Sequence, residues 1–185
     1  ISNWKHIINT LANLDNVNIA APRINITGLL STGEKSEGIM VECINPHKEL
    51  ILNSTFVDHP CLDLLLNESD GILLGKALAK KLNVAIGDYV TFMTTTAAGA
   101  LNAIDVKIAG EITAENVEIE KRTAKIHIQS AAMLLNSNKV ERIVVGLYTT
   151  DALSKTIQEA ESILTDDLVI KDWQELADYY KQVVC

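Results

Sequence analysis

Apolar residues recur at helical spacing at both ends of the chain. Near the N-terminus, one stripe repeats at intervals of three and four residues: Trp4, Ile7, Ile8, Leu11 and Leu14. This stripe predicts an amphipathic helix over residues 3–14, capped by Ser2. Near the C-terminus, Asp172 and Glu175 have the spacing of a capping box, which predicts a final helix over residues 173–184. A further apolar stripe predicts a helix that starts near residue 151.

Between these helices the period changes to two, which is typical of strands. The strands predicted in this way cover residues 17–27, 38–44, 89–95, 103–113, 117–119, 124–128, 140–148 and 168–170. Pro22 cannot donate a ladder hydrogen bond, so it marks a bend or an edge in the first strand. The run at 140–148 is continuously apolar, which is typical of a strand buried on both faces.

The stretch from Gly71 to Thr91 organises the middle of the chain. It predicts a short buried strand, a hinge at Gly75, a two-turn helix, a turn at Gly87-Asp88 and a second strand. Leu78 and Leu82 should face inward from the helix. Shorter helices are predicted at residues 47–52, 62–66 and 130–136.

This order of strands and helices predicts an α+β fold. Both chain ends contribute strands that are too apolar to stand alone, so we expect them to share one mixed sheet of the βαβ type. That lobe would comprise residues 1–45 and 117–185, and residues 46–116 would form an inserted, mainly β lobe. Residues 1–185 would together be one domain.

Composition favours a folded domain with an aliphatic core. Hydrophobic residues make up 48% of the 185 residues and aromatic residues only 4%. At this length about 70% of the unfolded surface should be buried, so a core needs no disulfide or metal. The net charge of −8 argues against a phosphate-rich partner, so nucleic acid is not expected to bind. No run of apolar residues reaches the length of a membrane span.

No catalytic, cofactor-binding or metal-binding residue stands out in the sequence. The local group Asp58-His59-Pro60-Cys61 with Asp63 consists of loop neighbours, which rarely converge on one ion. The stretch Gly71–Gly75 lacks the Lys and the Ser or Thr of a phosphate loop. The acidic run is typical of a solvated face and comprises Glu115, Glu118 and Glu120. We therefore expect a protein that is not an enzyme.

Three cysteines do not make a disulfide framework, because one must be unpaired. Cys43 lies in an apolar strand and is expected to be a small buried residue, whereas Cys185 is expected to be exposed. A Cys43–Cys61 disulfide could form in an oxidising compartment, and the sequence does not decide this question.

A succession of short motifs resembles a known family. Ala21-Pro-Arg-Ile24 is followed by Gly28-Leu-Leu-Ser31 and by a strand that ends Cys43-Ile-Asn-Pro46. The series then continues with Ile72–Leu82, Gly87-Asp88, Val106–Gly110, the short helix Ala131–Leu135, Asp172-Trp173 and Glu175-Leu176. In this order, over essentially the whole chain, the motifs resemble the MacB-like core domain. That domain is the extracytoplasmic part of FtsX/LolC/LolE/MacB-type ABC transporter permeases, whose usual Gly-Ile-Asp-Pro-like turn differs from this chain at Cys43 and Asn45.

The resemblance implies a periplasmic domain of a bacterial inner-membrane permease. Transmembrane helices would flank residues 1 and 185, and the helices over residues 3–14 and 173–184 would continue them as a stalk. The implied partners are a second permease subunit in the membrane, an ABC ATPase subunit, and a periplasmic adaptor or lipoprotein cargo. The domain would perform no covalent chemistry. It would couple cytoplasmic ATP hydrolysis to substrate export or lipoprotein release by mechanotransmission.

Two other classes of protein fit parts of the pattern. Double-psi barrels also contain a strand, a short helix, a Gly-Asp turn and a strand, as residues 71–91 do. Such a chain would be a cytoplasmic substrate-recognition domain. A free periplasmic binding protein would instead hold a ligand in a cleft.

Overall fold

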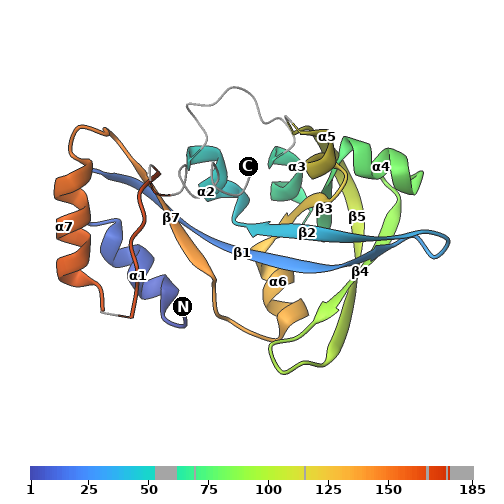
Figure 1. Cartoon of the computed structure of the whole chain (residues 1–185), viewed down its shortest axis with the longest axis horizontal. Coiled ribbons are helices and arrows are strands. Elements are labelled where there is room, and N and C mark those ends of the chain that lie inside the picture. The colour runs from blue at the N-terminus through green and yellow to red at the C-terminus, as the bar shows by residue number, and fades with distance from the viewer. Residues whose placement is uncertain (53–61, 69, 115, 166, 174, 176–185) are drawn as a thin grey trace.

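The computed structural model describes residues 1–52, 62–68, 70–114, 116–165, 167–173 and 175. Within these residues the fold is α+β, as predicted, and the strands form one mixed seven-stranded sheet (Figure 1). The strands are β1 (Val17–Ser31), β2 (Ser36–Ile44), β3 (Gly71–Gly75), β4 (Tyr89–Thr95), β5 (Leu101–Ile112), β6 (Thr123–His127) and β7 (Arg142–Leu147). The helices are α1 (Trp4–Leu11), α2 (Pro46–Leu52), α3 (Leu62–Asn67), α4 (Lys76–Leu82), α5 (Val117–Glu120), α6 (Ile128–Leu135) and α7 (Leu153–Ile163).

Six of the strands close into a ring. β1 pairs with β2, β2 with β6, β6 with β3, β3 with β5, β5 with β4, and β4 with β1 again. The β2–β6 and β3–β5 pairs are parallel, and the other four pairs are antiparallel. Closure satisfies backbone hydrogen bonds that an open sheet would leave at its two edges.

Alternate residues of the ring strands face one shared core. Leu74 of β3, Phe92 of β4 and Ile126 of β6 are fully buried in it. Helices α4 and α6 add Leu78 and Leu134 to the same cluster. Burial of each such side chain contributes about 1.5–3 kcal/mol. This core therefore holds the ring and the two helices together as one unit.

The longest strand, β1, extends beyond the ring at its N-terminal half. Residues Arg23–Ser31 pair with β2, and residues Val17–Arg23 pair with β7. Pro22 lies at this change of partner, where β2 no longer accompanies β1. The prediction that Pro22 marks an edge is therefore confirmed. Close by, Lys48 of α2 donates from its Nζ to the Ala20 carbonyl oxygen at 2.6 Å.

A second core joins α1 to α7. It contains Ile7, Ile8 and Leu11 of α1, together with Ala20 of β1 and Ala160 of α7. Figure 1 shows α1 and α7 side by side, next to the outer part of β1 and β7. The apolar stripe of residues 3–14 and the stripe that starts near residue 151 thus predicted helices that pack in the same place.

The prediction for residues 71–91 is confirmed in its elements, which are β3, α4 and the start of β4. Leu78 and Leu82 are buried, as the helical spacing required. Gly87 has a φ of 96°, a conformation that favours glycine. The turn is fixed further because the Ala85 N–H donates to Asp88 Oδ2 at 2.8 Å.

The role predicted for Gly75 is wrong. Its φ of −54° and ψ of 131° are open to other residues, so no hinge conformation requires glycine there. Glycine is needed instead because a β-carbon would overlap the carbonyl oxygen of Glu120. Glu120 was also expected on a solvated face, but it is buried, and it accepts from the N–H groups of Ala77 at 2.7 Å and Ala114 at 3.1 Å. One of these donors is a first-turn N–H of α4 that has no partner within the helix.

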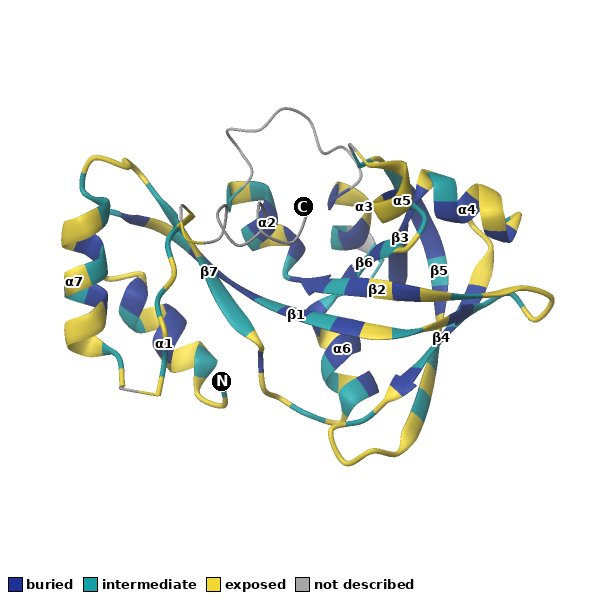
Figure 2. Ribbon diagram, viewed as in Figure 1, coloured by how far each residue is buried: buried dark blue, intermediate teal, exposed yellow. Residues whose placement is uncertain are grey.

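Three strand predictions are wrong. Residues 117–119 belong to helix α5, because Asn116 Oδ1 accepts from the Glu118 N–H at 2.8 Å and caps that helix. Residues 168–170 form no strand in the part of the chain that the structure describes. β7 is half-buried rather than buried on both faces, because it is the last strand of the sheet and has only β1 beside it among the described strands (Figure 2).

Of the two predicted helix caps, the one at Ser2 is wrong and the one at Asp172 is confirmed in part. Asn3, not Ser2, occupies the N-cap position of α1. The Glu175 N–H donates to Asp172 Oδ1 at 2.8 Å, which confirms that half of the capping box. Residue 174 and residues 176–184 of the predicted final helix lie outside the described residues. No helix in the described ranges combines the length and the apolar character needed to cross a membrane.

The division into two lobes stays a prediction. Strands of both sets of residues contribute to the ring: β1, β2 and β6 from residues 1–45 and 117–185, and β3, β4 and β5 from residues 46–116.

Candidate functional site

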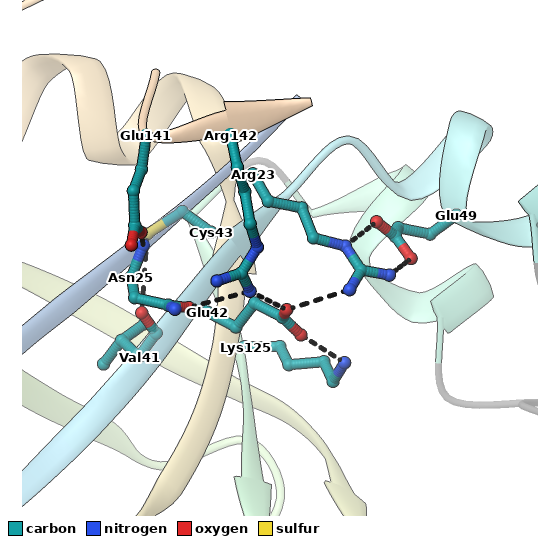
Figure 3. Close-up of polar contacts among 9 residues, drawn as sticks. All are labelled: Arg23, Asn25, Val41, Glu42, Cys43, Glu49, Lys125, Glu141 and Arg142. Carbon is teal, nitrogen blue, oxygen red and sulfur yellow. Dashed lines mark hydrogen bonds and ion pairs between the residues drawn. The ribbon is translucent and has the colours of Figure 1, made fainter. Parts of the chain in front are cut away.

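A network of charged side chains lies where β1 passes from β7 into the ring (Figure 3). Its most buried member is Glu49 of α2, whose side chain is 1% exposed. Arg23 of β1 meets Glu49 in a two-pronged ion pair, with Nε to Oε1 and Nη2 to Oε2 both at 2.7 Å. This geometry gives stronger and more directional bonds than a single-point contact.

Glu42 of β2 forms the centre of the network. Its Oε1 accepts from Arg23 Nη1 at 3.2 Å and from Arg142 Nη2 at 3.1 Å. Its Oε2 accepts from Lys125 Nζ at 2.8 Å. One carboxylate thus connects β1, β2, β6 and β7 through side chains alone.

The charges within the network stabilise one another. Burial alone would raise the pKa of Glu42, but the positive charges of Lys125, Arg23 and Arg142 outweigh this effect and lower it. Burial alone would lower the pKa of Arg23, but its hydrogen bond to Glu49 and the charges of Glu42 and Glu49 raise it. Both groups are therefore ionised across the physiological pH range.

The network is better suited to hold elements of the fold together than to catalyse a reaction. The side chains of the network are guanidinium, ammonium and carboxylate groups that bind one another. Cys43, which follows Glu42 in β2, is completely buried. The network ties α2 and β7 to the ring, so it connects the part built on the second core to the part built on the first.

Cys43 is a free cysteine that is poorly suited to react. Burial, followed by the nearby charges of Glu42 and Glu141, raises the pKa of its thiol to about 12. The thiolate is the reactive form, so reaction requires the protein to open.

We expect Cys43 to react at least about a hundred-fold more slowly with a thiol reagent in native buffer than in denaturant, because it is buried and protonated. The measurement uses a Cys61→Ser/Cys185→Ser variant, so that Cys43 is the one remaining thiol. In that background, Lys80→Cys on the exposed side of α4 should react quickly in native buffer and serves as the control. Equal native rates for the two thiols would contradict the expectation.

The loop group of metal-type side chains, which the sequence did not favour as a metal site, cannot be placed. Asp58, His59 and Cys61 lie outside the described residues, and Asp63 lies on α3. No cluster of three or more His, Cys, Asp or Glu side chains suited to a metal occurs among the residues that the structure describes. The charged network itself was missed by the sequence analysis, because its members are single polar residues on separate elements.

No family model matches the chain, but its fold is shared with solved extracytoplasmic domains of other proteins. The extracellular domain of the ABC-type transporter YknZ from Gram-positive bacteria is similar, with a TM-score of 0.65 and 16% identity over 88% of this chain and 82% of that one. The periplasmic region of MacB from Actinobacillus actinomycetemcomitans has a TM-score of 0.63 and 14% identity over 97% of this chain and 81% of that one.

A third solved structure agrees with these two. It is a domain of a candidate permease protein from Porphyromonas gingivalis, with a TM-score of 0.52 and 16% identity over 87% of this chain and 69% of that one. At such identities the three comparisons establish the fold of the chain.

Proposed function

We propose that this chain is the extracytoplasmic domain of an FtsX/MacB-type ABC transporter permease, and that it performs no covalent chemistry. The observation that carries the proposal is the fold shared with domains of YknZ and MacB over most of both chains. In this role the domain lies on the periplasmic side of the inner membrane. It passes on movement driven by ATP hydrolysis in the cytoplasm, which leads to substrate export or lipoprotein release.

The second core supports an insertion between two membrane helices. Such a domain must have its entry and exit on the same side. α1 at the start of the chain packs in one cluster with α7, and Leu164, Leu168 and Ile170 pack against that cluster. The start of the chain therefore lies close to these three residues.

The charged network supports transmission of movement. A domain that transmits a displacement must keep its parts in fixed positions relative to one another while it moves. The network joins α2, β1, β2, β6 and β7 at the place where the two cores meet. A displacement of the α1–α7 region should therefore reach the ring.

The proposed partners follow from this role. The chain's own transmembrane helices would flank residues 1 and 185, and a second permease subunit would complete a dimer in the membrane. An ABC ATPase subunit would bind on the cytoplasmic side. A periplasmic adaptor or a lipoprotein cargo would bind the domain itself.

The proposal predicts that ATP hydrolysis and transport can be separated. In membranes that contain the full-length permease and its ATPase, a short flexible linker in place of residues 1–185 should leave ATP hydrolysis measurable and abolish export or release. Reinsertion of the same domain at the same junctions is the control and should restore transport. A full-length product that fractionates away from membranes would refute the proposal and favour a cytoplasmic barrel domain.

A further inference from the structure

A groove of about 580 Å³ lies beside the first residues of the chain. One wall is formed by residues 2–6 at the start of α1, and the other by the start of α6 and residues 137–140. Ile24, Ile128 and Val140, which are all buried, provide an apolar floor. The network described above contributes no side chain to this lining.

The two walls are joined by direct hydrogen bonds. The backbone of residue 1 exchanges two of them with Val140, at 2.7 and 3.1 Å. Trp4 Nε1 donates to the Asn138 carbonyl oxygen at 2.8 Å. These bonds hold Lys139 next to residue 1, and Lys5 Nζ lies 5.5 Å from the centre of the Trp4 ring. The groove is therefore formed before any ligand arrives.

The ionisable side chains of the groove are all basic. They are Lys5, His6, His127 and Lys139, and no carboxylate of the described residues joins them in the lining. Neither lysine forms an ion pair with a described residue. In a chain with a net charge of −8, this local excess of positive charge is unusual. It favours an anionic ligand.

The two lysines are the cationic groups that the proposal uses, and His127 is not one of them. Burial, and then the charge of His47, lowers the pKa of His127. Its neutral ring accepts the Gln129 N–H on Nδ1 at 3.1 Å and so caps α6. An ammonium group forms short, charge-assisted hydrogen bonds with phosphate oxygens.

We propose that this groove binds the phosphate of an anionic lipid headgroup, with Lys5 and Lys139 as its cationic ligands and the apolar floor beneath the glycerol. The inference rests on the proposed function, in which a membrane span precedes residue 1. In that role Lys5, near the start of α1, and Lys139, held beside residue 1, lie on the side of the domain from which the chain would continue to the membrane. Trp and Lys are side chains that concentrate at membrane surfaces.

Fluorescence of Trp4 provides the test. A Trp173→Phe variant of the whole chain leaves Trp4 as the single tryptophan. It is titrated with monomeric dihexanoyl phosphatidylglycerol, with dihexanoyl phosphatidylcholine and with sodium phosphate. Phosphatidylglycerol should give a saturable change that weakens with added salt, and the other two probes should bind at least about ten-fold more weakly.

Paired variants separate the groove from overall charge. Lys5→Gln/Lys139→Gln should weaken phosphatidylglycerol binding by about 25-fold, at about five-fold for each lysine. Lys76→Gln/Lys80→Gln on α4 removes the same charge away from the groove and should leave the affinity unchanged. An equal loss in both pairs would overturn the proposal.

Three other results would also overturn it. The first is the absence of saturable binding, the second is equal affinity for phosphatidylcholine, and the third is equal affinity for sodium phosphate, which would identify a free-phosphate site. These outcomes are distinct from failure of the proposed function, which is decided by the membrane fractionation and transport of the full-length protein. A groove without lipid affinity would leave that function intact.

Discussion

Glu49→Ala is expected to lower the free energy of unfolding by about 3–5 kcal/mol, the range found when one partner of a buried ion pair is removed. The substitution leaves the Arg23 guanidinium, whose side chain is 19% exposed, without its two-pronged partner. It does not empty the network, because Glu42 still contacts Arg23. The expected loss in melting temperature is about 6–20 °C for a domain of this size.

Thermal and urea unfolding of the purified chain measure this effect. Glu118→Ala is the matched control, because Glu118 pairs with Lys121 at 2.6 Å on the surface and is mostly exposed. That substitution should leave the free energy of unfolding close to that of the unchanged chain, because exposed ion pairs contribute little to stability. A double replacement, Arg23→Met/Glu49→Leu, should recover much of the loss, since it leaves no buried charge unpaired. Equal effects of the two alanine substitutions would show that the buried ion pair contributes no more to stability than the exposed one.

Gly75→Ala is expected to destabilise the protein by about 3 kcal/mol, the upper part of the usual range for overpacked sites. The new β-carbon would overlap the Glu120 carbonyl oxygen and lie 2.8 Å from its carbonyl carbon. Both atoms belong to the backbone, so no side-chain rotation can relieve the clash. α5 would have to move away from α4, which would also strain the bond from the Ala77 N–H to Glu120 Oε1.

Gly38→Ala is the control for this second prediction. Gly38 lies on β2 with no atom within 4 Å of the position that a β-carbon would take. The alanine should therefore leave the stability unchanged or raise it by up to about 1 kcal/mol, because it reduces the freedom of the unfolded chain. If Gly75→Ala unfolds at the same urea concentration as Gly38→Ala, the close approach of Glu120 is not rigid.

The spacing of apolar residues predicted individual helices and strands of this chain well. The stripe that includes Ile7, Ile8 and Leu11 became the buried face of α1. The alternation between residues 103 and 113 became β5, paired with β4 as a hairpin. These elements were predictable because their burial depends on residues two, three or four positions apart.

The closed ring could not be predicted in the same way. Its closure depends on pairs such as Met40 with Thr123 and Ile72 with Ile126, which are distant in the sequence. Periodicity tells which face of a strand is buried, but it carries no information on which strand lies beside it. The pattern of apolar runs therefore indicated a mixed sheet and left its closure unknown.

The charged side chains were the least predictable part. Glu120 stands in an acidic run that is typical of solvent-exposed residues, yet it is buried because the N–H groups of Ala77 and Ala114 need an acceptor. Arg23, Glu49 and Arg142 are far apart in the sequence, and no spacing pattern connects them. Only the packing of α2 and β7 against β1 brings them together.

The length of β1 has a mechanical consequence. This one strand runs from the α1–α7 region into the ring and pairs with β2 over nine consecutive residue pairs. Antiparallel hydrogen bonds lie perpendicular to the strands. Tension along β1 would therefore load many of these bonds together in shear, instead of opening them one after another. A pull at the second core should be resisted along the whole strand, so the two parts would separate only at a high force.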